Sequence, residues 1–366
     1  MEVRFFKKSE RQLLLDSIDR LWKHNHVYVR QPEVLEHLVL NTPYRADFAG
    51  EDNYSFLGMW HDNDVVGLLG VIPQEVNVFG KTKQSATYTV WITDRNRKER
   101  FNGLELHNCL DNKNISMKLC IGISEVAAKM YRFLRWDSID ELPRWVAVNN
   151  LTLARKVLLP STTAPELLPQ IVPVSINSDL RVDFDDVDGL RWDDFYYCKF
   201  APISIGTCRN FKFLKWRYLK SPILKYHFVT VSDKAGRYQG LAVLRIEPIC
   251  NGQYRIGRIL EFIAINAEAS LRLAEAVVNF DKDVIMWDFY CLSDITVYGL
   301  ERIGFQKIPV WMDKVIMPTR FQPIDYENMK LNGAIYLQAD LTRKINPMSS
   351  YQWYITKGDA DQDRAN

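Results

Sequence analysis

The chain has 366 residues, of which 47% are hydrophobic and 25% charged, and its formal net charge is +2. Domains usually run to ~100–200 residues, so this length predicts two of them. The low net charge, with no long basic run, gives no general case for nucleic-acid binding. Residues 1–8 are too polar for a signal peptide, and no apolar run approaches the ~20 residues that span a bilayer. We therefore expect a soluble, cytoplasmic protein without a membrane span.

The cysteines and histidines give no metal-binding pattern. The six cysteines include no C-x-x-C pair, and His24-Asn25-His26 contains the only close pair of histidines. Zinc sites need such clustered ligands, so we expect no metal. Reduced and mostly buried thiols are the default for a cytoplasmic protein.

Hydrophobic periodicity in the first half predicts alternating groups of strands and helices. The strands are expected at residues 3–6, 54–60, 65–72, 83–92 and 118–123. The helices are expected at residues 10–22, 33–40, 101–110 and 124–134. This order indicates an α+β fold with a mixed, mostly antiparallel sheet flanked by helices, and not a doubly wound nucleotide-binding fold.

A similar order returns after a proline-rich connection. Strands are expected at residues 226–232, 240–247, 254–265 and 284–291, and helices at 268–280 and 295–303. The predicted division is a first domain at 1–150, a linker at 151–182, a second domain at 183–320 and a C-terminal segment at 321–366.

Both halves share one detail that suggests an internal duplication. Ser124 follows a predicted strand, opens a helix and precedes Trp136 by 12 residues (136 − 124). Ser293 precedes Phe305 by the same 12 residues (305 − 293). A serine at the helix start and an aromatic residue after its end are each common, but the shared spacing indicates divergent copies of one domain.

The strongest local signal is a basic loop between a strand and a helix. The strand ends near Ile92, and Gly103 falls in the first turn of the next helix. The loop cations are Arg95, Arg97, Lys98 and Arg100. Free amides at a helix start, a glycine that admits a ligand and flanking cations suit a pyrophosphate. A solvated basic loop is the alternative interpretation.

The segment Arg100-Phe-Asn-Gly103-Leu-Glu105 resembles the acyl-CoA-binding signature of the GCN5-related N-acetyltransferase (GNAT) superfamily, Arg/Gln-x-x-Gly-x-Gly/Ala. Glu105 departs from the last position of that signature. The resemblance implies that the 88–92 strand end pairs with the pantetheine arm and that the 118–123 strand splays away to admit it. The second half lacks the signature, so a duplicate there has lost its coenzyme site.

The same resemblance assigns roles to individual residues. The implied coenzyme contacts are Trp91, Ile92, Arg95, Arg97, Lys98, Arg100, Asn102, Gly103 and Leu104. Tyr131 lies where the family often carries a tyrosine that protonates the leaving thiolate, and core packing is the alternative. Backbone amides near Ile92 and Asp94 are expected to stabilise the oxyanion, and Tyr88 is expected beside the substrate.

Two further segments, Phe213–Pro222 and Tyr351–Arg364, resemble parts of two-domain GNAT proteins encoded with cell-surface polysaccharide enzymes. Ala365 departs from the proline expected there. The resemblance implies an N-acyltransferase acting on a dTDP-linked 3-amino-3,6-dideoxyhexose, with acyl-CoA or an acyl carrier protein as donor. In this group some members transfer 3-hydroxybutanoyl groups.

The C-terminal segment combines aromatic residues with charges. Disordered tails are poor in aromatics, so Tyr351, Trp353 and Tyr354 should anchor a strand. That strand would fix Asp361 and Asp363 as candidate catalytic carboxylates. The candidate substrate contacts on the same segment are Asp359 and Arg364. A solvated acidic tail is the alternative.

Trp216-Arg217-Tyr218 also has two interpretations. The tryptophan and arginine suit a base and a diphosphate, which makes the three residues candidate substrate contacts. They equally suit helix packing with an internal ion pair.

Two rival functions remain open at this stage. One is an aminoacyltransferase related to the peptidoglycan-branching enzymes, which would need a basic face for tRNA. The other is a non-catalytic binding protein made of two degenerate domains.

Overall fold

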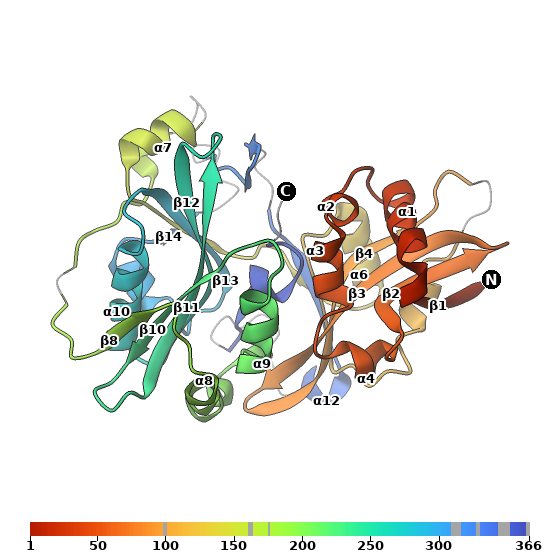
Figure 1. Ribbon diagram of the computed structural model, residues 1–366, viewed down its shortest axis with the longest axis horizontal. Helices are drawn as coiled ribbons and strands as arrows, with labels where there is room; N and C mark the ends of the chain where they lie inside the picture. The colour runs from red at the N-terminus through yellow and green to blue at the C-terminus, as the bar shows by residue number, and fades with distance from the viewer. Residues whose placement is uncertain are drawn as a thin grey trace.

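The computed structural model describes residues 1–97, 101–159, 164–174, 176–308, 316–326, 330–342 and 352–363. Its α-helices are α1 (Arg11–Leu21), α2 (Val27–Arg30), α3 (Pro32–Val39), α4 (Arg45–Ala49), α5 (Leu104–Asn108), α6 (Glu125–Phe133), α7 (Leu151–Val157), α8 (Gly189–Phe195), α9 (Phe211–Leu214), α10 (Ala267–Val278), α11 (Tyr298–Arg302) and α12 (Ala339–Thr342). The two lobes lie side by side, and the C-terminal segment runs between them (Figure 1).

The first lobe is built on a mixed sheet with the order β1-β2-β3-β4-β5-β17-β6. The bounds are β1 (Glu2–Lys7), β2 (Asn53–His61), β3 (Asp64–Val78), β4 (Lys81–Thr93), β5 (Met117–Ile121), β17 (Gly333–Leu337) and β6 (Asp137–Ile139). Only β4 and β5 pair in parallel along this path, and the other neighbours are antiparallel. The short β9 (Ile205–Thr207) also pairs with β3.

The second lobe repeats this arrangement with the order β8-β10-β11-β12-β13-β7-β14. The bounds are β8 (Arg181–Phe184), β10 (His227–Ser232), β11 (Tyr238–Ile249), β12 (Tyr254–Ala264), β13 (Val284–Leu292), β7 (Arg144–Val148) and β14 (Gln306–Lys307). Here β12 and β13 form the parallel pair. Matching strand orders and matching parallel pairs are what an internal duplication would produce.

The two lobes exchange one strand each. β7 follows β6 of the first lobe in sequence, yet it lies between β13 and β14 of the second sheet. In return β17, near the C-terminus, lies between β5 and β6 of the first sheet. The division predicted at residue 150 therefore falls just after a strand that the second sheet uses. Each lobe completes its sheet with a strand from the other half of the chain.

The predicted α+β class and tandem mixed sheets are confirmed, and the elements expected from periodicity are all present. Several differ in extent; α11, for example, spans only Tyr298–Arg302, and β11 extends over Tyr238–Ile249. β3 continues to Val78, and α5 spans only five residues because the Asn102 side chain accepts a hydrogen bond from Leu104 N and starts the helix late. β5 ends at Ile121, since Gly122 follows with φ +75°. The predicted linker contains α7.

The C-terminal segment is an internal part of the fold. Trp353 and Tyr354 are 0% and 1% exposed, and β18 (Ile355–Thr356) pairs with the end of β13. Residues of both sheets and of this segment share one apolar cluster, which includes Leu119, Ile121 and Ile355. The predicted aromatic anchor is confirmed for Trp353 and Tyr354, while Tyr351 lies outside the described residues. The remaining strands are β15 (Arg320–Phe321) and β16 (Ile324–Asp325), which form a small hairpin.

Candidate functional site

The first lobe contains a split between its two parallel strands. Pairing of β4 with β5 ends at Tyr88 and Cys120, while β4 continues five residues further to Thr93. A register shift between Leu69 and Val71 marks a bulge in β4 at the point where the strands part. Such bulges re-aim a strand and terminate pairing. The end of β4 therefore turns one backbone edge away from β3 and towards the split.

Backbone alternation identifies which amides face this split. Asp94 N donates to Val66 O at 2.8 Å, so that amide points towards β3. Successive N–H groups of a strand point to opposite edges, which directs the amides of Thr93 and Trp91 to the split and that of Ile92 to β3. The amides of Ile92 and Asp94 themselves therefore face β3, and the prediction of an oxyanion site near them narrows to their neighbours. Trp91 N and Thr93 N are the available donors.

Aromatic side chains line this end of the first lobe. Trp91 stacks on His107 with ring centroids 5.6 Å apart, and its indole N–H donates to Gly103 O at 3.0 Å. Tyr131 lies 5.6 Å from the Trp91 ring, and Cys120 Sγ donates to the Tyr131 hydroxyl at 2.7 Å. Burial, then the neighbouring Cys120, raises the pKa of Tyr131 well above its usual value. The phenol therefore stays protonated and able to donate.

Tyr88 and His107 complete the cluster. Tyr88 is 2% exposed, and its hydroxyl lies 3.1 Å from His107 Nδ1. Burial lowers the pKa of His107 to about 4, with the Lys118 ammonium as a second cause. The imidazole is therefore neutral near pH 7. Tyr88 and Tyr131 are both buried, so their predicted roles beside the substrate and as the acid stay predictions.

The basic loop leaves β4 and leads into α5. Arg97 pairs with Asp64 and lies 3.7 Å from Asp94, whereas Arg95 is exposed. Gly103 packs beneath Trp91, where an added Cβ would lie 3.4 Å from the indole nitrogen. Lys98 and Arg100 lie outside the described residues. Of the predicted coenzyme contacts, Trp91 and Gly103 meet at this end of β4. Contact of these and the other predicted residues with a coenzyme stays a prediction.

In the second lobe the corresponding split is filled by the chain itself. Pairing of β12 with β13 ends at Ile259 and Phe289, and beyond it Thr356 and Ile355 pair with Cys291 and Leu292. On the opposite side the Tyr354 hydroxyl accepts a hydrogen bond from Phe262 N at 2.9 Å. The C-terminal segment thus bridges both diverging strands. A pantetheine arm has no room here, which agrees with the missing signature.

A fully buried ion cluster locks the segment in place. Arg209 Nη1 and Nη2 donate to both oxygens of Asp359 at 2.9 and 2.7 Å, and Arg209 Nε donates to Glu261 at 2.8 Å. All three side chains are 0% exposed. Tyr218 also donates to Glu261, at 2.5 Å, and Arg217 donates to the carbonyls of Gly358 and Ala360. We call Arg209, Glu261 and Asp359 the tail lock.

The predicted substrate contacts Trp216, Arg217, Tyr218 and Asp359 are therefore bound within the protein. Trp216 is 4% exposed and donates its indole N–H to His37 O at 2.8 Å. Arg217, Tyr218 and Asp359 hold the C-terminal segment, and Arg364 lies outside the described residues. Direct contact of these residues with a substrate stays a prediction, and the partners observed are intramolecular.

The two candidate catalytic carboxylates have different surroundings. Asp363 accepts hydrogen bonds from Arg245 at 2.7 Å and Tyr226 at 2.6 Å. Burial would raise the pKa of Asp363, but the Arg245 cation and the Tyr226 hydrogen bond lower it below its usual range. Asp361 instead accepts from the Tyr28 hydroxyl at 2.8 Å. Asp361 is the better candidate base, because Asp363 is held as an anion in an ion pair.

Asp361 also lies at the first split. The neighbouring Gln362 donates to Ile121 O, the end of β5, at 2.9 Å, and its side chain covers Gly122. Sequence reasoning missed Tyr28, Arg209 and Gln362. Tyr28 and Arg209 lie far from their partners in the chain, and no local motif marks either of them. The segment that fills the second split thus delivers its carboxylate to the first.

Within the described ranges no three His, Cys, Asp or Glu side chains are grouped as metal ligands. Nor does any described helix have the length and apolar composition needed to cross a membrane. All six cysteines are free thiols.

No family model matches the chain, and no curated protein matches it. Solved structures do. A probable N-acyltransferase from Enterococcus faecalis gives a TM-score of 0.56 at 14% identity, covering 84% of this chain and 70% of that one. A GCN5-related N-acetyltransferase from Anabaena variabilis gives 0.56 at 10% identity, covering 92% and 72%. Saccharomyces cerevisiae N-myristoyltransferase with bound myristoyl-CoA gives 0.51 at 11% identity, covering 92% and 78%. The chain therefore has a GNAT-like fold.

Proposed function

We propose that the protein is an N-acyltransferase of the GNAT type, which moves an acyl group from acyl-CoA to an amine. The observation that carries the proposal is the asymmetry of the two splits. The second is closed by the C-terminal segment, and the same segment places Asp361 beside the first. A donor site and a candidate base thus meet in the first lobe.

The donor would lie along the free edge of β4. The amides of its pantetheine arm pair with the backbone near Trp91 and Thr93, which lies beyond the last pairing to β5. Exposed Arg95, in the loop that follows, suits the pyrophosphate of coenzyme A. The basic loop would equally suit an acidic acyl carrier protein, which we retain as the alternative donor.

The chemistry needs one proton acceptor and one proton donor. The free amine attacks the thioester carbonyl and forms the C–N bond, and Trp91 N or Thr93 N stabilises the oxyanion. Collapse breaks the C–S bond, and the Tyr131 phenol protonates the departing thiolate. Asp361 accepts the proton that the amine loses, and Tyr28 orients it through the 2.8 Å hydrogen bond. Proton transfer of this kind typically contributes ~10²–10⁴-fold in rate.

For the acceptor we propose the amino group of a nucleotide-linked amino sugar, specifically a dTDP-linked 3-amino-3,6-dideoxyhexose. The segments 213–222 and 351–364 support this through their resemblance to polysaccharide-associated proteins. A 3-hydroxybutanoyl donor and a role in cell-surface polysaccharide synthesis in the bacterial cytoplasm belong to the same proposal. We expect the pKa of the acceptor's amine to lie below that of lysine, which is ~10.4. A weak base such as Asp361 therefore suffices to accept the proton from this amine.

The test is thiol release from acetyl-CoA and 3-hydroxybutanoyl-CoA, measured with and without a dTDP-linked amino sugar. We expect release that depends on the acceptor and falls in Asp361→Asn, with Asp363→Asn as the comparison. Thermal shifts report binding separately, because a ligand at 100 times its Kd adds about 2.7 kcal/mol of stability. If no thioester gives either a thermal shift or turnover, the proposal fails. The aminoacyltransferase or the binding protein then remains as the function.

A further inference from the structure

A polar cleft separates the two lobes next to the candidate site. It has a volume of about 490 Å³ and is lined on one side by the α1–α2 turn of the first lobe and on the other by the β15–β16 hairpin. This volume falls in the ~300–1,000 Å³ range of small-molecule sites. The cleft includes His26 and Val27, which directly precede Tyr28, the partner of Asp361.

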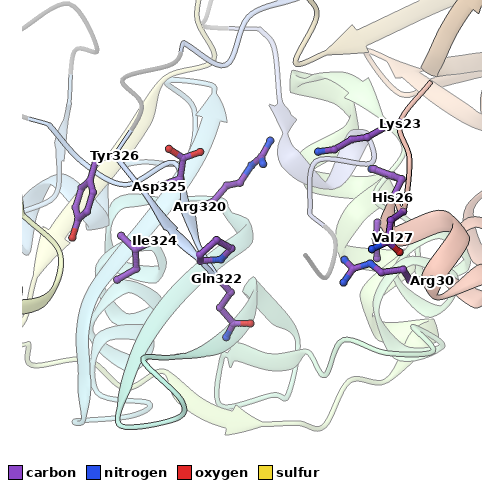
Figure 2. Close-up of a pocket in the computed structure, with 11 residues that line it drawn as sticks. Lys23, His26, Val27, Arg30, Arg320, Gln322, Ile324, Asp325 and Tyr326 are labelled. Atoms are coloured by element: carbon purple, nitrogen blue, oxygen red, sulfur yellow. The ribbon is translucent and has the colours of Figure 1, made fainter. Parts of the chain in front are cut away.

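Three cations reach into this cleft from opposite walls. Figure 2 shows Lys23 and Arg30 extending from the first lobe and Arg320 from the hairpin. All three are exposed, and none forms an ion pair or a side-chain hydrogen bond with another described residue. Among the described residues of the lining, Asp325 is the one acidic side chain. Within that described set, three cations against one carboxylate leave two positive charges uncompensated.

That charge distribution selects the class of ligand. A single carboxylate would satisfy one guanidinium, whereas cations on both walls need an anion with several charged oxygens. A phosphate or diphosphate meets that need. Tyr326, 39% exposed, belongs to the same lining, and its hydroxyl donates to Val157 O at 3.3 Å.

We infer that this cleft binds the acceptor through a phosphate or diphosphate group held by Lys23, Arg30 and Arg320. The identification of the ligand as the acceptor rests on the proposed function. The anion site itself rests only on the residues that line the cleft. It places the diphosphate contact away from Arg217, which was one of two sequence interpretations and which donates to the carbonyls of Gly358 and Ala360.

The test measures Kd by calorimetry for pyrophosphate, dTDP and coenzyme A separately, with pyrophosphate and dTDP also titrated against coenzyme-saturated protein. The variants are Lys23→Gln, Arg30→Gln and Arg320→Gln, with Lys8→Gln and Arg95→Gln as controls for an exposed lysine and for the coenzyme loop. We expect binding of pyrophosphate and dTDP to weaken about tenfold or more per cleft variant, because each loses a charge-assisted hydrogen bond. Lys8→Gln should leave it unchanged.

The outcomes separate the two ideas. Cleft-dependent dTDP binding without acyl transfer would support the anion site and contradict the proposed function. Intact acyl transfer with dTDP binding that ignores all three cleft variants would overturn the anion site alone. Weakened binding of coenzyme A, rather than of dTDP, in the cleft variants would assign the cleft to the donor and overturn the acceptor assignment.

Discussion

Removing Arg209 tests whether the tail lock holds the C-terminal segment between the lobes. Arg209→Met deletes the guanidinium and leaves the Glu261 and Asp359 carboxylates, both 0% exposed, without their cation. The lost contacts include three ionic hydrogen bonds of 2.7 to 2.9 Å. Removing one partner of a buried ion pair typically costs about 3–5 kcal/mol. We expect a loss of that size in the free energy of unfolding.

Urea unfolding at pH 7 measures this loss, and one triple variant locates its origin. Adding Asp359→Asn and Glu261→Gln to Arg209→Met should recover part of the stability, because the stranded carboxylates are then neutral. Proteolysis should also cut near residues 352–363 sooner in Arg209→Met than in the native protein. A loss below about 1 kcal/mol, or no recovery in the triple variant, would refute the lock.

Three other predictions follow from single sites. The pKa values of His37 and His107 are both about 4, chiefly through burial, against about 6.5 in the unfolded chain. The unfolded state binds more protons between these values, so stability should fall as pH drops from 6.5 to 4. His107→Gln should flatten that fall in urea titrations, and an unchanged slope would rule out His107. Tyr131→Phe should lower acyl-transfer turnover by ~10²-fold or more with unaltered coenzyme Kd, and full turnover would remove Tyr131 as the acid. Gly358→Ala should loosen the segment, because its Cβ would overlap the Tyr218 hydroxyl and lie 2.8 Å from Glu261 Oε1. A melting temperature equal to the native one would contradict that packing.

The sequence predicted those features that rest on local pattern. Alternation and helical periodicity located the strands and helices of both lobes, and the aromatic residues before the acidic tail correctly indicated an anchored strand. The basic loop after β4 was also visible, because its cations lie close together in the sequence. Each of these depends on residues that are neighbours in the chain.

The strand exchange and the tail lock have no such signal. The exchanged strands are only five residues long, at Arg144–Val148 and Gly333–Leu337. The local sequence of neither strand indicates which of the two sheets it joins. Arg209 meets Asp359 across 150 positions of sequence. The 216–218 stretch had the composition of a ligand site, yet its hydrogen bonds go to the protein, because burial of these side chains is decided by the whole fold. Composition alone cannot separate these outcomes.

In the proposed enzyme one split binds a coenzyme, while the other is filled by the chain. Calorimetric titration of the native protein with acetyl-CoA and a longer 3-hydroxyacyl-CoA tests this most directly. The structure predicts one site per chain, with affinity lowered in Arg95→Gln. Two sites per chain, or no saturable binding of any thioester, would contradict it.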